Sequence, residues 1–399
     1  MSVQHSFMRN ANTRAILNYI RIYGASTRRE IQAATGLSWG AVSTITAELL
    51  AQEQLIETRK TTPVSGRVPS LLDFNLSKNL SIGVEINIEG ITIVLVDVRN
   101  NILCAKEEML DEAERDAVLR QLKRMLKDLL RENKLSNSHL LGIGIAIQGL
   151  VDRSGSISRY NHYIQNWTNV PLKSILEEYF NLPVSVIHDP ICIALAQEQQ
   201  NHRLRDQDFI LIRLAYGIGM CYMHEGKPIP GFEGIAGELG HLVVDIHGRP
   251  CSCGNRGCLE AYCSIRGIAQ GLYNLLKDDP QYTLSPPSGS DVNNLNHLMA
   301  LGIKLAQNGN PNVQKIFSEA GTYLGQGVVN LIHLLNPRYI VLTGAVMDAS
   351  EFFMPQVMSC IREHTCYDSQ VELLAVRESR RCASLGAALK FINEAFESD

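Results

Sequence analysis

The chain has 399 residues, of which 45% are hydrophobic, and a formal net charge of -4. A chain of this length can form two or three domains, each with its own hydrophobic core. It has no apolar run near the roughly 20 residues that a membrane helix needs, and its first ten residues lack the apolar core of a signal peptide, so we expect a cytoplasmic protein without membrane insertion.

Charge is divided unevenly along the chain. Residues 1–76 carry eight Arg or Lys and five Asp or Glu, a net charge of +3, which leaves -7 for the remainder. A small basic segment on a larger acidic body indicates that the N-terminal segment binds nucleic acid. Differences of a few charges are common between domains, so this indication needs support from the predicted elements.

Three short helices are predicted at the N-terminus. Apolar residues recur at helical spacing over residues 11–23. A second helix, residues 28–35, follows a capping Ser26 or Thr27, and a third helix runs over residues 39–52. The tight turn between the second and third helices is typical of a helix-turn-helix.

The second helix of such a motif enters the major groove of DNA, with its N-terminal residues nearest the base edges. Those positions are occupied here by Ser38, Trp39, Gly40, Ser43 and Thr44. Together with the strands that follow, these helices predict a winged helix-turn-helix DNA-binding domain over residues 1–76.

Two short alternating strands, residues 55–59 and 68–74, flank a hairpin with a basic tip. This pattern predicts a wing, with Gly66 and Arg67 at its tip placed to enter a groove or hold a phosphate. We expect Arg28 to contact the DNA backbone. The alternative is a three-helix protein-binding module whose polar face is only solvated, but helices, turn, wing and basic tip together favour DNA.

The body, from residue 80 onward, alternates strands with amphipathic helices. Two passages, residues 80–97 and 209–224, look like versions of one unit, in which a strand, a glycine-containing turn and a returning strand follow one another. Further strands are predicted at residues 141–147, 184–187, 339–342 and 371–374. Helices are predicted at residues 112–133, 172–179, 190–200, 264–277, 313–335, 351–364 and 383–397.

Alternation with a duplicated start predicts a two-lobed α/β body with a cleft between the lobes. We assign residues 80–190 to the first lobe and expect the C-terminal helix, residues 383–397, to pack on it. Residues 191–382 form the second lobe. Residues 152–169 and 280–294 are predicted as long loops.

Three of the ten cysteines, Cys251, Cys253 and Cys258, lie within eight residues, and nine residues separate His241 from the first of them. Three thiolates and one imidazole make a complete tetrahedral set for a structural zinc ion, with no position left open for catalysis. Such ligands argue against magnesium or calcium. The alternatives are buried cysteines that act as small hydrophobic residues, or a disulfide and a spare thiol. The polar local sequence favours zinc.

Two carboxylates, Glu238 and Glu260, lie on either side of this cluster. Gly254 and Gly257 allow the backbone to bend tightly enough for the cysteines to face one ion. We expect the metal to fix where the two acids point. The alternative is that both are solvated acids on a loop.

At these residues the body resembles the ROK family, which comprises repressors, open reading frames and kinases. Residues 237–241 and the cysteine cluster look like the family signature, and His188 with Asp189 at a strand end resembles the element that carries the catalytic base of the kinases. The resemblance implies a two-lobed actin-like (ribonuclease-H-like) sugar-kinase fold behind the winged helix. With that domain attached, the chain resembles the sugar-responsive repressors of the family.

The resemblance also implies roles for particular residues. The zinc ligands of the family match His241, Cys251, Cys253 and Cys258, and its sugar contacts match Asp189, Glu238, His241 and Glu260. The chemistry agrees, because a fixed carboxylate can accept the hydrogen of a sugar hydroxyl and a metal-bound imidazole can donate through its free ring nitrogen. The sugar-lobe Asn of the family has no clear match, since Tyr163 falls near its place between Asn161 and Asn166.

The loops that hold ATP in the kinases differ in this chain. The first, Asp-x-Gly-Gly-Thr in the kinases, reads Glu-Ile-Asn-Ile-Glu at residues 85–89; the second, Gly-Thr-Gly-x-Gly, reads Ala-Tyr-Gly-Ile-Gly at 215–219; the third, Leu-Gly-Gly, reads Leu-Thr-Gly-Ala at 342–345. Side chains in place of glycine, and a carboxylate near phosphate, disfavour ATP. We therefore predict no enzyme activity, with Asp189 matching only the position of the kinase base.

The sequence thus predicts a DNA-binding transcriptional regulator of carbohydrate metabolism genes, a repressor controlled by a sugar or sugar phosphate. Binding to two operator half-sites implies a homodimer or homotetramer. One alternative is an active ATP-dependent sugar kinase with an appended DNA-binding domain. A second alternative is a regulator controlled by a partner protein instead of a ligand.

Overall fold

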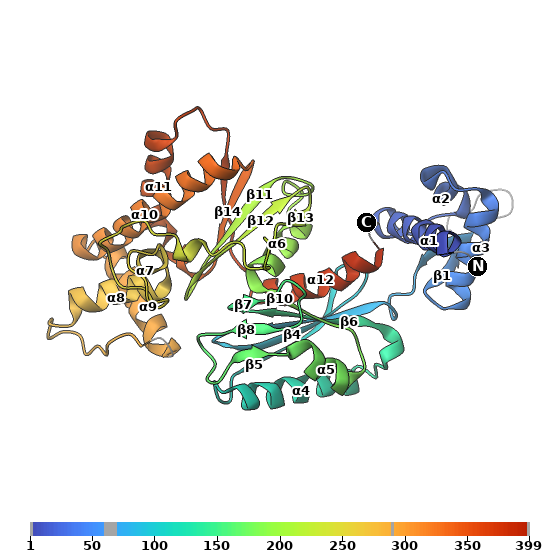
Figure 1. Cartoon of the computed structure of the whole chain (residues 1–399), viewed down its shortest axis with the longest axis horizontal. Coiled ribbons are helices and arrows are strands. Elements are labelled where there is room, and N and C mark those ends of the chain that lie inside the picture. The colour runs from blue at the N-terminus through green and yellow to red at the C-terminus, as the bar shows by residue number, and fades with distance from the viewer. Residues whose placement is uncertain (1–2, 60–69, 289–290, 397–399) are drawn as a thin grey trace.

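The computed structural model describes residues 3–59, 70–288 and 291–396. A small helical head at the N-terminus is joined to a larger body of two lobes, and the C-terminal helix lies between them (Figure 1). The head contains α1 (Val3–Tyr23), α2 (Arg28–Thr35), α3 (Trp39–Ala51) and the antiparallel strands β1 (Leu55–Arg59) and β2 (Ser70–Phe74).

The ends of the head helices are fixed by local hydrogen bonds. Thr27 and Glu30 form a capping box, in which the Thr27 hydroxyl accepts from the Glu30 N–H at 3.2 Å and the Glu30 carboxylate accepts from the Thr27 N–H at 2.7 Å. Gly36 ends α2 in the left-handed region at φ +68°. The Ser38 hydroxyl then caps α3 through the Ala41 N–H. The predicted helix-turn-helix is therefore confirmed, with Thr27 as the first cap.

Each lobe is built on a five-stranded sheet of the same topology. The first sheet has the order β10-β6-β3-β4-β5, with β3, β4 and β5 antiparallel and β6 and β10 parallel to β3. The second has the order β13-β12-β11-β14-β15, with β11, β12 and β13 antiparallel and β14 and β15 parallel to β11. The predicted two-lobed α/β body with a duplicated start is confirmed.

The strands of the first sheet are β3 (Leu80–Ile86), β4 (Gly90–Val96), β5 (Ile102–Met109), β6 (Leu140–Ile147) and β10 (Val184–His188). Those of the second are β11 (Phe209–Leu214), β12 (Ile218–His224), β13 (Lys227–Pro228), β14 (Tyr339–Thr343) and β15 (Glu372–Ala375). A small third sheet contains β7 (Leu150–Val151), β8 (Ser158–Tyr160) and β9 (Thr168–Val170).

The helices of the body form layers on both sides of these sheets (Figure 1). One face of the first sheet packs on α4 (Arg115–Glu132) and α5 (Leu172–Phe180). Between the two sheets lie α6 (Asp189–Gln200) and α12 (Cys382–Phe396). The outer face of the second sheet packs on α7 (Glu260–Cys263), α8 (Ile265–Leu276), α9 (Val292–Gln307), α10 (Pro311–Leu335) and α11 (Ser350–His364).

Several elements differ from those predicted. The first helix begins at Val3 instead of residue 11, and the expected loop over residues 152–169 contains β8 and the start of β9. In the expected loop over residues 280–294, α9 already begins at Val292. The missed strand β5 is mostly exposed or half-buried and mixes charged and apolar residues, so it lacks the apolar run by which its neighbours were recognised.

The C-terminal helix α12 approaches its neighbours at backbone distance. A Cβ on Gly144 of β6 would lie 1.9 Å from the Ala387 carbonyl oxygen, and a Cβ on Gly386 would lie 1.7 Å from the carbonyl oxygen of Cys192 in α6. The other end of α12 contacts the head, where Arg21 donates to Asn393 at 3.1 Å and the Phe74 and Phe396 rings meet edge to face, 5.4 Å apart. This helix therefore touches both lobes and the head.

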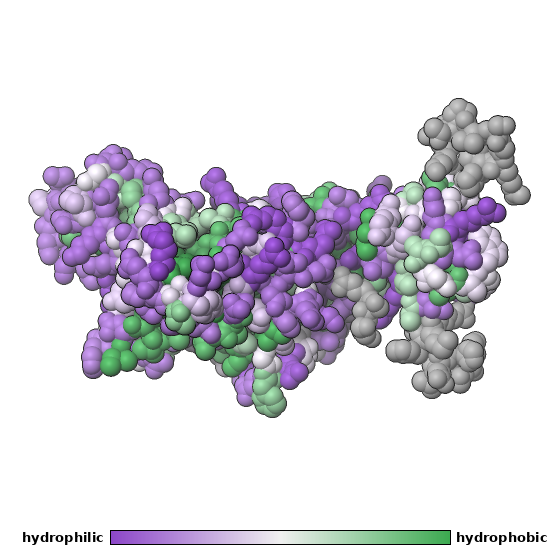
Figure 2. Space-filling model, turned by 90° about the horizontal axis from the view of Figure 1, so that it is seen from above, coloured by the Kyte–Doolittle hydropathy of each residue, from purple (hydrophilic) through white to green (hydrophobic). Residues whose placement is uncertain are grey.

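The surface is mostly hydrophilic, with smaller apolar patches between polar regions, in the view of Figure 2. Among the helices in the described part of the chain, none has the length and apolar character needed to span a membrane.

We expect Gly144→Val to lower the free energy of unfolding by at least about 3 kcal/mol, because a branched side chain would overlap the α12 backbone. Urea or thermal unfolding measures the change. The matched control is Gly40→Ala, since a Cβ at that exposed helical position would meet nothing within 4 Å. The control should leave stability unchanged or raise it by up to about 1 kcal/mol. Equal stability of Gly144→Val and the wild type would contradict the close packing of α12.

Candidate functional site

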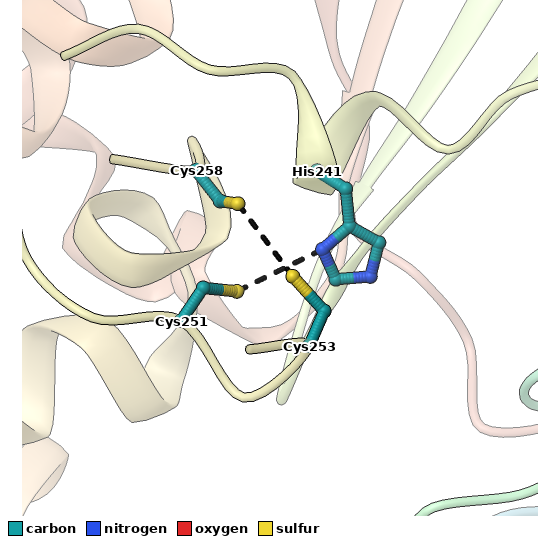
Figure 3. Close-up of side chains that lie close together, drawn as sticks. All are labelled: His241, Cys251, Cys253 and Cys258. Atoms are coloured by element: carbon teal, nitrogen blue, oxygen red, sulfur yellow. Dashed lines mark hydrogen bonds between the residues drawn. The ribbon is translucent and has the colours of Figure 1, made fainter. Parts of the chain in front are cut away.

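Four sulfur and nitrogen ligands converge in the second lobe (Figure 3). One ligand atom from each of His241, Cys251, Cys253 and Cys258 lies within 4.8 Å of the others. His241 ends a short 3-10 helix, Leu239–His241, and Cys258 lies just before α7. Gly254 and Gly257, at φ +91° and +70°, turn the loop between the cysteines, which confirms the bend expected there.

The distances within this cluster fit a tetrahedral ion. The Cys253 and Cys258 sulfurs are 3.7 Å apart, and the Cys251 sulfur is 3.7 Å from His241 Nδ1. Four ligands around zinc would give sulfur–sulfur distances of about 3.8 Å and sulfur–nitrogen distances of about 3.6 Å. A disulfide needs about 2.05 Å, and all ten cysteines are free thiols. The donor set therefore suits a metal ion.

The protein alone disfavours a thiolate at Cys258, which is the buried cysteine of the cluster. Burial, followed by the neighbouring Cys251 and Cys253, raises the pKa of Cys258 to about 12. Without a cation, the Cys258 thiol would therefore be protonated at neutral pH. A metal ion would supply the compensating charge, as in structural sites with several thiolates.

His241 connects the cluster to the acids. Its Nδ1 faces the cysteine sulfurs, while its Nε2 lies 4.0 Å from a carboxylate oxygen of Glu238. Both side chains are partly exposed, 30% for His241 and 36% for Glu238. One imidazole can thus hold a metal through Nδ1 and present Nε2 beside Glu238.

Glu260, the first residue of α7, is held by hydrogen bonds to the loop over residues 215–219 and to the cysteine loop. One carboxylate oxygen accepts from the Ile218 N–H at 3.2 Å and the other from the Ser252 hydroxyl at 3.2 Å. A Cβ on Gly217 would lie 2.7 Å from the first oxygen, so a side chain there would crowd the Glu260 carboxylate, and it would lie in ordinary contact, 3.8 Å, with the Tyr163 hydroxyl. Glu260 and Tyr163 therefore face the same stretch of backbone.

Together with His162, which lies near Glu260 and His241, Tyr163 reaches this region from its loop. Burial raises its pKa to about 12, and Arg266 lies over its ring at 5.5 Å from the centroid. Asn161, by contrast, is buried and structural, since its amide nitrogen donates to the Gln148 carbonyl and its oxygen accepts from the Tyr163 N–H. Asn166 lies within 3.5 Å of Glu114 instead.

Asp189 lies at the start of α6, where its buried carboxylate contacts Arg213 and lies near His188. One oxygen accepts from the Arg213 guanidinium, and the other lies 3.5 Å from His188 Nε2. The same guanidinium contacts Glu378 at 2.7 Å and Glu85 at 3.4 Å. Sequence reasoning missed Arg213, although an arginine in the otherwise apolar strand β11 was a usable signal.

Tyr216 connects two of the loops, residues 85–89 and 215–219, whose counterparts hold ATP in the ROK kinases. Its hydroxyl lies 2.7 Å from a Glu89 carboxylate oxygen and 2.9 Å from the Asn296 amide oxygen. The first loop, the second loop and α9 are thus joined through one phenol. Tyr216 and Glu89 together add bulk and negative charge where these two loops meet.

In the head, the start of α3 presents the predicted DNA-reading residues. Ser38, Trp39, Gly40 and Thr44 are exposed and Ser43 is half-buried. Arg28 is less available than expected, because its guanidinium contacts Glu57 at 2.8 Å and Thr46 at 3.0 Å. It braces α2 against α3 and β1, and its contact with DNA stays a prediction. Gly66 and Arg67 lie outside the described residues.

Comparison with known proteins extends these observations over the whole chain. The family model of the ROK family matches residues 81–393. A xylose repressor of Bacillus spizizenii is 27% identical over 357 residues, which cover 90% of this chain and 87% of that one. An N-acetylglucosamine repressor of Escherichia coli O157:H7 is 27% identical over 372 residues, 93% of this chain and 89% of that one.

Solved structures agree with the fold. A ROK family transcriptional regulator, described as a homolog of the E. coli MLC protein, superposes with a TM-score of 0.80 at 24% identity and covers 98% of this chain and 96% of that one. A ROK hexokinase from Thermus thermophilus superposes with a TM-score of 0.67 at 23% identity, over 80% of this chain and all (100%) of that one. The predicted sugar-kinase fold behind a winged helix is confirmed.

We expect Glu85→Gln to change how stability depends on pH. Burial raises the pKa of Glu85 to about 7, above its ordinary value of 4.5. Because the folded protein binds this proton more tightly, its stabilising contribution is complete below about pH 4.5 and is lost as pH rises through about 7. Urea unfolding at pH 5 and pH 8 should show the variant gaining up to about 3 kcal/mol relative to the wild type at the higher pH.

Glu107→Gln is the control for this comparison, since Glu107 forms an exposed ion pair with Arg381. Its stability should follow that of the wild type across the same pH range. Parallel profiles for Glu85→Gln and the wild type would show that Glu85 keeps no proton in the folded state.

Proposed function

Because this chain belongs to the ROK family, we propose that it is a DNA-binding transcriptional regulator, a repressor of carbohydrate metabolism genes controlled by a sugar or sugar phosphate. The observation that carries the proposal is the combination within one chain of a helix-turn-helix head, whose third helix begins at exposed residues, and a body with residues that match the sugar contacts of the family. Relatives that are named repressors match about nine-tenths of the chain, head included.

The proposed effector site comprises Glu238, His241, Glu260 and Asp189. The first three converge beside the cysteine cluster, where His241 Nε2 can donate to a hydroxyl and each carboxylate can accept one. Tyr163 adds a hydroxyl near Glu260. Several fixed acceptors and one fixed donor suit a polyol such as a sugar, because each hydroxyl both donates and accepts.

We propose that the cysteine cluster holds a structural zinc ion. Four protein ligands leave no place for a catalytic water, so the ion performs no chemistry of its own. Its role is to fix the imidazole of His241 and the loop that ends at Glu260, since a metal-bound histidine is held in one ring orientation.

Catalysis is not part of the proposed function. A kinase of this fold needs a free carboxylate as base and glycine-rich loops for the phosphates of ATP. Here Asp189 is paired with Arg213, and Tyr216 with Glu89 joins the loops. The position of Asp189 alone favours the alternative of an active sugar kinase. ATP consumption with a panel of sugars would establish that alternative, and absence of turnover supports the regulator.

The head is proposed to bind operator DNA through Ser38, Trp39, Gly40, Ser43 and Thr44, with Arg28, Gly66 and Arg67 as further contacts. Two half-sites one helical turn apart imply a homodimer or homotetramer. A chromosomal regulator works in the cytoplasm.

A partner protein could control the same head, and operator binding that does not change with any sugar tested would favour that alternative.

We expect Cys253→Ser to lower zinc content from about one ion per chain to a trace, because thiolate is the zinc ligand and a hydroxyl is not. Elemental analysis of the purified protein measures the ratio. Cys366→Ser is the matched control, since Cys366 is also exposed and lies outside the cluster. A Cys253→Ser protein that keeps zinc and its response to sugars would contradict the assigned role of the cluster.

We expect Glu238→Ala to remove the response to sugar while leaving DNA binding intact. DNA binding is measured by selection from a random duplex library, which should recover an inverted repeat. The response to sugars and sugar phosphates is measured by the thermal shift that each of them causes. An effector at 100 times its dissociation constant should stabilise the wild type by about 2.7 kcal/mol, and the variant should lose most of this because a charged hydrogen bond contributes about 1.5–3 kcal/mol.

Glu351→Ala, at the exposed start of α11, is the control and should respond like the wild type. If the Glu238→Ala variant responds to the same sugar with the same affinity as the wild type, the effector site lies elsewhere. Failure to recover any preferred duplex would count against the regulator itself.

A further inference from the structure

Arg213 lies where four separate chain segments meet. It belongs to β11 of the second lobe, and its three carboxylate partners come from β3 of the first lobe, from the start of α6 and from the segment between β15 and α12. These partners are Glu85, Asp189 and Glu378. All four side chains are buried or nearly so, with exposures from 4% to 12%. The guanidinium therefore links the two lobes through buried ion pairs.

The donors of Arg213 are shared unequally among the three acids. Glu378 is held in bidentate fashion, through Nη2 at 2.7 Å and Nε at 3.2 Å, and Asp189 is held through Nη1. Glu85 is the most distant, at 3.4 Å. Three carboxylates thus compete for one cation in a buried place, so a change at one of them alters the hold on the others.

Asp189 is the member of this group that also belongs to the proposed effector site. The hydroxyl of the nearly buried Tyr163 feels the charges of Arg266, Glu260, Asp189 and Arg213, so Glu260 and Asp189 both act on this one side chain. A ligand that donates a hydroxyl hydrogen to Asp189 would therefore compete directly with the guanidinium for that carboxylate.

We infer that Arg213 is the positioning residue that reports effector binding to the DNA-binding head. The inference rests on the proposed function and deepens it. Without effector, Arg213 holds Asp189 and Glu378 together. With effector, Asp189 turns its hydrogen bonds to the sugar, Arg213 is released from it, and the segment that carries Glu378 is free to shift.

A path from Glu378 to the head is present in the fold. Glu378 lies four residues before Cys382, the first residue of α12, and α12 packs on β3, β6 and α6 without room for a side chain at their closest points. Its last turns meet the head through Asn393 with Arg21 and through Phe396 with Phe74. A helix packed this closely moves as a unit, so a shift at its start reaches α1 and β2.

This arrangement couples the affinity for DNA to the affinity for the effector, so that removing Arg213 should change them in opposite directions. If the Arg213 contacts favour the DNA-binding arrangement, removing them must weaken DNA binding and, because the effector no longer competes with Arg213, tighten effector binding. General damage to the fold would weaken both. The opposite signs of the two changes are what distinguish a positioning role from a structural one.

The first test needs no effector. Hydrogen–deuterium exchange of the ligand-free full-length protein should show loss of amide protection over residues 376–396 and 14–23 in Arg213→Gln. Arg203→Gln is the matched control, because Arg203 forms an ion pair with Glu372 of neighbouring β15 but is exposed. Protection unchanged from the wild type in Arg213→Gln, or lost equally in both variants, would overturn the inference.

The second test measures both affinities of Arg213→Gln. The probes are the duplex recovered from the random library and the sugar or sugar phosphate that stabilises the wild type most. We expect DNA binding to weaken and sugar binding to tighten, each by about fivefold or more. Weakening of both, or no change in either, would overturn the inference. If no sugar in the panel binds the wild type, the proposed function fails, and the exchange experiment still decides the role of Arg213.

Glu378→Gln provides a second variant in case removal of Arg213 prevents folding. It removes one of three competing carboxylates and leaves the Arg213–Asp189 pair in place. We expect the sugar to bind no more tightly than to the wild type, because Arg213 then holds Asp189 at least as firmly, while the effect of the sugar on DNA affinity falls below about fivefold. A full response in Glu378→Gln would show that the signal does not pass through this segment.

Discussion

The structure depends on the close packing of α12 between the two sheets. Its backbone touches β3, β6 and α6 at positions where Gly83, Gly144 and Gly386 leave room for carbonyl oxygens, and its far end meets the head. Because closely packed interiors shift between discrete arrangements instead of deforming smoothly, the two lobes and the head cannot move independently of this helix. The position of α12 therefore sets the position of the head relative to the two lobes, and hence that of the proposed DNA-binding surface relative to the proposed effector site.

What could be predicted from the sequence was mostly what is local in it. The metal cluster is compact in sequence, its glycines adopt the left-handed conformation expected of them, and the caps of α2 and α3 lie at or next to the predicted residues. The apolar strands of both sheets were recognised because they are buried on both faces and read as continuous hydrophobic runs. Local chemistry and burial thus agree with the fold over most of the body.

What could not be predicted depends on contacts between distant segments. In the sequence, Arg213 stands out only by its charge. Its role follows from its contacts with Glu85, Asp189 and Glu378, which three separate segments bring to it. Likewise, the loops around Glu89 and Tyr216 differ visibly from those of the kinases, but sequence does not show that the two side chains bond to each other. Strand β5, partly exposed and mixed in composition, gave no periodic signal.

The shared buried cation also explains how a kinase fold can serve as a sensor. Transfer of phosphate requires a carboxylate free to take a hydroxyl proton and a loop that admits phosphate, whereas sensing requires only that ligand binding differ between two arrangements of similar free energy. One guanidinium among three buried acids can meet the second requirement, since a ligand that takes one of the acids leaves the guanidinium the other two as partners. Pairing Asp189 with Arg213 thus occupies the carboxylate that would serve as the base and, under the proposal, provides a contact for which a sugar would compete.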